Sequence, residues 1–126
     1  MYGLFSRKQV KFLDKVFFCY PVMEKIVQDI RSRKQTSAEC SDDPTALCAL
    51  AGMNPEEIEQ WVGICRSAFS IQDTFTQKIL KGRYVAKESP EDTCFKNHIS
   101  WSTYWRIRKE FLFYAGVLAR EEKMKF

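Results

Sequence analysis

The sequence predicts an all-α protein on three observations. Apolar residues recur every three or four positions through most of the 126 residues, as they do along one face of a helix. Proline follows Asp, Asn or Ser at three places, which is typical of a capped helix start: Asp43-Pro44, Asn54-Pro55 and Ser89-Pro90. No hairpin dipeptide or run of alternating polarity indicates a β-strand. With 45% hydrophobic residues, the chain can fill a core.

The first 30 residues predict two helices. Val10, Leu13 and Val16 share one face of a helix that extends from Ser6 to Cys19. Because Pro21 lacks the N–H that a helix interior uses, we expect it to begin a second helix that reaches Ile30. The segment that follows, residues 31–42, is polar and has no periodicity, so it predicts a loop.

Two more helices complete an N-terminal helical part that we assign to residues 1–69. Asp43-Pro44 predicts a short helix from Thr45 to Ala51, with Gly52 as its C-cap. Asn54-Pro55 is a stronger start signal for the next helix. The apolar stripe of that helix consists of Ile58, Trp61, Val62, Cys65 and Phe69.

Residues 70–126 predict a helix-turn-helix part. Ser70 to Asp73 resembles a capping box before a helix that ends at Gly82. Ser89-Pro90 begins a short helix to about Asn97, and Ser100 begins a long one to about Glu122. The order of helix, turn, short helix, turn and long helix is typical of the motif. We expect the apolar face of the long helix to comprise Tyr104, Ile107, Phe111, Tyr114, Ala115 and Leu118.

The opposite face of the last helix carries the candidate DNA-binding residues. Ser102, Arg106 and Lys109 point away from the core, with Trp105 on the flank. In a helix-turn-helix, the N-terminal side chains of the second helix meet base edges in the major groove. Arg106 is the best candidate for a bidentate contact with guanine. The alternative is an ordinary amphipathic helix with a solvated basic face.

The remaining candidates support that assignment. Ser100 would cap the helix while its backbone N–H groups face a phosphate. Trp101 and Trp105 could contact thymine methyl groups or sugars, although Trp101 lies close enough to the apolar face to pack there. The expected phosphate contacts are Lys81, Arg83, Arg108 and Lys109.

The charge of the chain is unevenly distributed. From Lys78 onward the chain contains eleven Lys and Arg and six Asp and Glu, a net charge of +5. Residues 1–77 contain nine Lys and Arg and ten Asp and Glu, a net charge of −1. The positive charge therefore accompanies the last helix, where phosphate attraction would need it.

Several function classes find no support in the sequence. The five cysteines are an odd number without a C-x-x-C pair, and no signal peptide or membrane-spanning run is present, so we expect a reduced, cytoplasmic location and no membrane partner. Cys94 and His98 lack two further ligands at zinc spacing, so no metal is expected. With a single His and no phosphate-binding loop, we expect neither an enzyme nor a cofactor.

Four stretches carry a family resemblance. They are Tyr20 to Arg31, Asp43 to Ala46, Ile58 to Val62 together with Phe69 and Ile79 to Tyr84, and Ile99 to Leu112. On these the chain resembles the RinA/ArpU-type phage late-gene transcriptional regulators, whose C-terminal part is similar to region 4 of sigma factors. The resemblance covers most of the chain from residue 20 onward, and its last stretch is the most specific.

The resemblance implies a phage protein of a Gram-positive host that binds double-stranded promoter DNA before a late operon and recruits host RNA polymerase. It implies DNA contacts at Trp101, Ser102, Trp105, Arg106 and Lys109. Such helices more often carry polar or basic residues at positions 101 and 105, where this chain has Trp. A homodimer would also suit such a regulator.

Two other functions stay open. One is the small subunit of a phage DNA-packaging terminase, which would form a ring-like oligomer. The other is a helical interaction module that binds polymerase or a regulator without DNA. In that module the tryptophans, together with Phe113 and Gly116, would form a protein interface.

Overall fold

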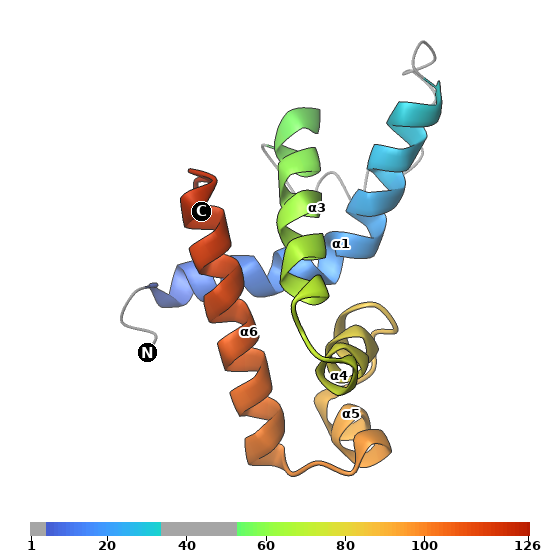
Figure 1. The fold of residues 1–126 in the computed structure, drawn as a ribbon, viewed down its shortest axis with the longest axis vertical. Coiled ribbons are helices and arrows are strands. Elements are labelled where there is room, and N and C mark those ends of the chain that lie inside the picture. Colours follow the sequence, from blue (N-terminus) through green and yellow to red (C-terminus); the bar gives the residue numbers. More distant parts are fainter. Residues whose placement is uncertain (1–4, 34–52) are drawn as a thin grey trace.

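The computed structural model describes residues 5–33 and 53–126, and the secondary structure of these two ranges consists of five helices without a strand (Figure 1). The all-α class is therefore confirmed. The helix expected from Thr45 to Ala51 and most of the expected loop at 31–42 lie outside the described residues.

Helix α1 (Arg7–Arg33) is one helix where the sequence predicted two. Pro21 lies inside it, so the separate helix start at Pro21 and the loop at residues 31–33 were wrong. Proline removes one hydrogen bond and kinks a helix, and α1 changes direction along its length in Figure 1. The helix continues because residues on both sides of Pro21 are buried in one core: Leu13, Val16, Phe17, Met23 and Val27.

Helix α3 (Pro55–Ser70) forms as its sequence predicts. The side chain of Asn54 accepts a hydrogen bond from the N–H of Glu57 at 2.8 Å, and the Glu57 carboxylate accepts one from the N–H of Asn54 at 3.1 Å. This reciprocal pair is a complete capping box. The predicted stripe is buried: Ile58, Trp61, Val62, Cys65 and Phe69.

Helix α4 (Thr74–Tyr84) begins three residues later than predicted and ends two residues later. Ser70 is the last residue of α3, and Asp73 is the N-cap of α4, with its carboxylate 2.7 Å from the N–H of Thr76. Gly82 continues the helix because the loop folds back onto it. A Cβ atom at Gly82 would lie 2.7 Å from Oε1 of Glu88.

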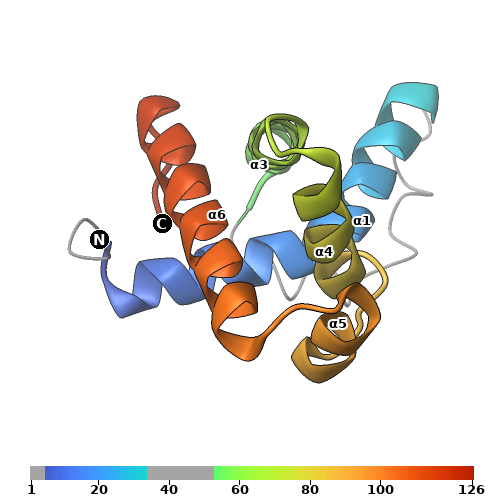
Figure 2. The same cartoon turned by 60° about the horizontal axis from the view of Figure 1, so that its bottom comes forward.

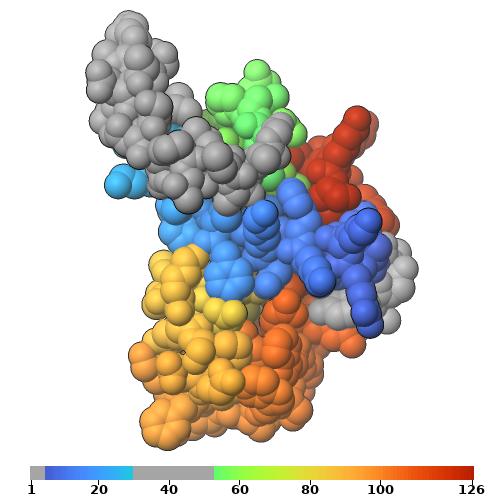
Figure 3. All heavy atoms as spheres, turned by 180° about the vertical axis from the view of Figure 1, so that it is seen from behind, coloured from blue at the N-terminus to red at the C-terminus, as the bar shows by residue number. Residues whose placement is uncertain are grey.

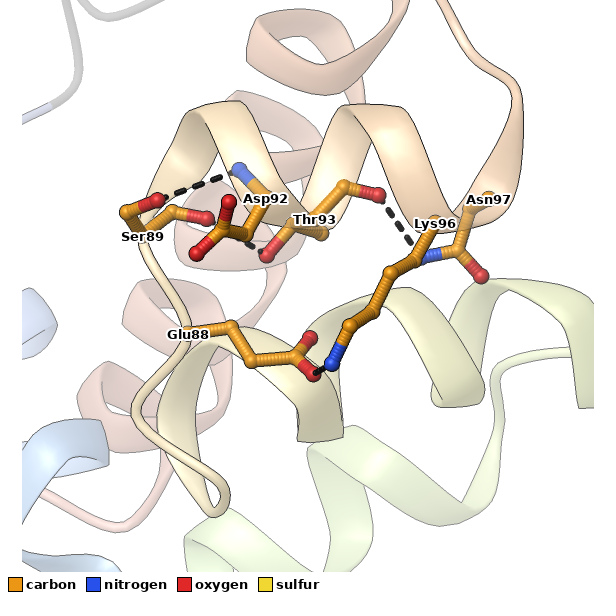
Figure 4. Close-up of polar contacts among 6 residues, drawn as sticks. All are labelled: Glu88, Ser89, Asp92, Thr93, Lys96 and Asn97. Atoms are coloured by element: carbon orange, nitrogen blue, oxygen red, sulfur yellow. Dashed lines mark hydrogen bonds and ion pairs between the residues drawn. The ribbon is translucent and has the colours of Figure 1, made fainter.

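Helix α5 (Pro90–Asn97) is short and capped at its start by Ser89. Figure 4 shows the polar contacts that hold it. The Ser89 hydroxyl accepts from the N–H of Asp92, and Lys96 forms an ion pair with Glu88 in the preceding loop. These contacts fasten α5 to the loop before it, and the N–H of Glu88 in that loop donates to the carbonyl of Gly82 on α4 at 3.0 Å.

Helix α6 (Trp101–Glu121) begins after the predicted cap, Ser100, whose hydroxyl accepts from the N–H of Thr103 at 3.1 Å. The buried face is wider than predicted. Tyr104, Phe111 and Ala115 are buried as expected, and Ile107, Tyr114 and Leu118 are partly buried against the same core. Burial also extends to Leu112, Gly116 and Ala119.

One core joins both predicted parts of the chain. Helix α1 lies behind α3 and α6 in Figures 1 and 2 and packs against both. The buried cluster takes residues from α1, α3, α4 and α6, which lie on both sides of the expected boundary at residue 70. Helix α5 and the first turn of α6 contribute no residue to this cluster, and they lie with α4 at one end of the molecule (Figure 1).

Candidate nucleic-acid interface

The turn between α5 and α6 comprises three residues with defined geometry. His98 adopts the left-handed conformation with φ 55° and ψ 44°, and the N–H of Ile99 donates to the carbonyl of Cys94 at 3.1 Å. A left-handed residue at this position ends a helix and satisfies its last carbonyls. Since Ser100 then caps α6, the direction in which α6 leaves the turn is fixed by local bonds.

The first turns of α6 present an exposed face of mixed chemistry. Ser102, Arg106 and Lys109 are exposed, as predicted, while Trp101 is 49% and Trp105 is 37% exposed. Positions 102, 106 and 109 follow the i, i+4, i+7 spacing of one helix side. We call these five residues the α6 face. It combines two cations and a hydroxyl with two large aromatic rings.

The two tryptophans are stacked on buried structure. The ring of Trp105 lies 5.6 Å from that of Trp101 and 5.1 Å from that of Tyr104, both edge to face. Tyr104 is itself buried. The tryptophan rings are therefore in contact with neighbouring rings and still partly exposed, so the helix start carries apolar surface of fixed orientation.

Arg108 does not share the exposure of its neighbours. Its Nη2 lies 3.3 Å from Oδ2 of Asp14 on α1, and its guanidinium is 5.0 Å from the ring centroid of Trp105. The other Asp14 oxygen accepts a hydrogen bond from the hydroxyl of Tyr84 at 2.6 Å. Three helices thus meet at one carboxylate, and the predicted phosphate contact at Arg108 lies in an internal ion pair.

Arg83 and Lys81 lie on α4, and Arg83 is held in contacts of its own, including one with Tyr104 beneath the α6 face. The guanidinium of Arg83 stacks over the ring of Phe18 at 4.4 Å and donates to the carbonyl of Glu88 at 3.1 Å. Lys81 lines a hollow between α1, α3 and α4 with Tyr20 and Phe69, and no residue of α6 lines it. The structure therefore brings neither cation onto the α6 face.

The pKa values of two tyrosines beneath the face are raised. Burial, reinforced by the charge of Asp14, raises the pKa of Tyr84 well above its ordinary value. Burial also raises the pKa of Tyr104, against the opposing effect of Arg83. The Tyr84 hydroxyl can therefore donate to Asp14 throughout the neutral pH range.

Three residues of this region were not predicted from the sequence. Asp14 and Tyr84 are 70 residues apart in the sequence, and no local sequence pattern predicts their contact. Phe95 on α5 is 82% exposed. A signal for Phe95 was present, since it is the only large apolar residue of its helix.

Phe113 and Gly116, which a helical interaction module would use as part of a protein interface, contact another residue of the same chain. The ring of Phe113 lies 5.8 Å from that of Phe5, edge to face. A Cβ atom at Gly116 would lie 2.7 Å from the same Phe5 ring. Both residues therefore contact the start of their own chain.

The described ranges contain no group of three or more His, Cys, Asp or Glu placed to hold a metal ion. Within the same ranges, no helix has the length and apolar character needed to cross a membrane. Cys19, Cys65 and Cys94 are free thiols. Comparison with models of protein families gave no match, and neither did comparisons with curated proteins and with solved structures.

Proposed function

We propose that this protein is a sequence-specific DNA-binding transcriptional regulator whose α6 face enters the major groove. The observation that carries the proposal is the combination of exposed Arg106 and Lys109 with a capped, anchored helix start at Ser100. Helix-turn-helix proteins use this arrangement, in which a short helix and a turn of three or four residues precede the reading helix.

The difference in burial between the two parts of α6 favours this function. Most buried residues of α6 lie from Phe111 onward, whereas in its first two turns Tyr104 is buried and Ser102, Trp105 and Arg106 are exposed. A major groove about 12 Å wide accepts a helix whose N-terminal side chains are unobstructed. The sequence resemblance extends the proposal to activation of phage late genes together with host RNA polymerase, on a reading helix like that of sigma region 4.

A second candidate is a helical interaction module that binds a protein without DNA. It is favoured by the exposed aromatic residues Phe95, Trp101 and Trp105. Exposed tryptophans are enriched where one protein binds another. The two functions differ in how binding responds to salt, because phosphate contacts release counterions and protein contacts between apolar surfaces do not.

Selection from a random duplex library, followed by anisotropy titration, tests the proposal. The selected duplex and a scrambled duplex of equal composition are titrated at about 50 to 200 mM salt. We expect the selected duplex to bind about 1,000-fold or more tightly than the scrambled one. If no duplex binds at the lowest salt, while the protein co-purifies with RNA polymerase, the interaction module is the correct function.

A further inference from the structure

The first half of α1 carries a row of cations on its outer side. Arg7, Lys8, Lys11 and Lys15 are all exposed and lie opposite the buried residues of the same helix. At 1.5 Å per residue, the row is about 12 Å long. We call these four residues the α1 row.

Within the first half of α1, a single acidic residue accompanies the α1 row. Asp14 is the only acidic residue before Glu24. Its carboxylate accepts from Tyr84 on one oxygen and faces Arg108 on the other, so its charge is already balanced. The net charge over residues 1–77 does not reveal this row, because most acidic residues of that range follow the α1 row in the sequence.

The same contacts show where α1 crosses α6. Asp14 lies in the middle of this part of α1, and its partner Arg108 immediately precedes Lys109 on α6. A Cβ atom at Gly116 would touch Phe5 and Leu13, so the start of α1 crosses α6 about two turns beyond Lys109, and α1 approaches the α6 face only toward Asp14 and Lys15. Figure 3 shows the first half of α1, in blue, with the N-terminal half of α6, in orange, directly below it on one side of the molecule.

We propose that the α1 row binds the phosphate backbone of the duplex next to the groove that α6 enters. This inference rests on the proposed DNA-binding function and adds phosphate contacts to those that the sequence predicts at Lys81, Arg83, Arg108 and Lys109. A row of about 12 Å is long enough to meet more than one phosphate of a DNA strand. Lysine suits this contact because it binds as a flexible point charge.

Two double variants that remove the same charge test the proposal. Lys11→Gln/Lys15→Gln removes half of the α1 row, and Lys25→Gln/Lys78→Gln removes two exposed cations elsewhere. The slope of log K against log salt is measured for each on the selected and the scrambled duplex. The slope is negative, and each lost phosphate contact reduces its magnitude by about 0.9. We therefore expect the α1 variant to lose about 1.8 and the matched control to stay near wild type.

The outcomes separate this inference from the function on which it rests. Equal weakening of the selected and scrambled duplexes, with their affinity ratio unchanged, supports phosphate binding by the α1 row. A slope equal to that of the control, in a protein whose wild type binds DNA, overturns the inference and leaves the proposed function intact. A large decrease in the ratio of the affinities for the selected and the scrambled duplex also overturns the inference, because the α1 row would then contact bases. Wild-type protein that binds no duplex overturns the function itself.

Arg108→Gln supplies the converse test. Because Arg108 is held by Asp14, we expect this variant to retain the wild-type slope. A loss of about 0.9 would place a phosphate on Arg108 and contradict the assignment to α1. Thermal denaturation of every variant confirms that the fold is intact before binding is compared.

Discussion

The carboxylate of Asp14 on α1 lies 3.3 Å from the guanidinium of Arg108 on α6, and this pair links the core to the α6 face. On one side, Asp14 is held by the buried hydroxyl of Tyr84. On the other side, Arg108 underlies the ring of Trp105. An exposed tryptophan is thus supported by a chain of contacts that ends in the core.

Loss of Asp14 is expected to destabilise the fold. Asp14→Ala leaves the buried Tyr84 hydroxyl without its acceptor, and such a loss costs about 1–3 kcal/mol in the free energy of unfolding. Tyr84→Phe removes the donor together with its need for a partner, so we expect a smaller cost. Urea denaturation measures both. An Asp14→Ala protein within about 0.5 kcal/mol of wild type, the range of ordinary surface substitutions, would contradict the contact.

Stability should decline at alkaline pH because of Tyr84. The pKa of Tyr84 is raised well above 10.0, first by burial and then by the charge of Asp14. Above about pH 10 the unfolded chain releases this proton and the folded chain retains it, so the free energy of unfolding falls as pH rises. The stability that Tyr84 contributes is fully present below that pH.

Urea titrations between pH 8 and 11 measure this decline in wild type and in Tyr84→Phe. The comparison is needed because burial also raises the pKa of Tyr20, to about 12, so part of the decline belongs to Tyr20. We expect a shallower decline in Tyr84→Phe. Identical pH profiles would show that Tyr84 ionises alike in both states.

Two glycines should respond oppositely to alanine. At Gly116 the new Cβ would meet Phe5 at 2.7 Å and Leu13 at 3.2 Å, so overpacking should cost about 1–3 kcal/mol. At Gly63, inside α3, nothing lies within 4 Å, and alanine should stabilise the helix by up to about 1 kcal/mol. Thermal melts of the two variants check the close approach of α6 to the start of the chain. A melting temperature of Gly116→Ala equal to or above that of wild type would contradict this close approach.

The helix starts were predictable because each is encoded by a few adjacent residues. Asn54, Ser89 and Ser100 cap helices as their sequence patterns predict. Pro21 was predicted wrongly, since the local rule gives the cost of an interior proline but not the burial on both sides that outweighs it. Ser70 was likewise mistaken for a cap because Asp73, three residues later, satisfies the same rule.

The side chains of the candidate site were only partly predictable. The outward direction of Ser102, Arg106 and Lys109 follows from helical periodicity, and the structure leaves all three exposed. The pairing of Arg108 with Asp14 depends on how α1 crosses α6, which periodicity within one helix does not specify. The burial of Leu112, Gly116 and Ala119 has the same origin, because α1 covers that flank of α6.

The reading role of Arg106 is tested most directly by its alanine variant. Anisotropy titrations on the selected and scrambled duplexes compare Arg106→Ala with Lys109→Ala. We expect Arg106→Ala to lower the affinity ratio of the two duplexes by the equivalent of about 1–3 kcal/mol, with an unchanged melting temperature because the side chain is exposed. Lys109→Ala should instead weaken both duplexes alike. An unchanged affinity ratio in a folded Arg106→Ala protein would contradict the assignment of α6 as the reading helix.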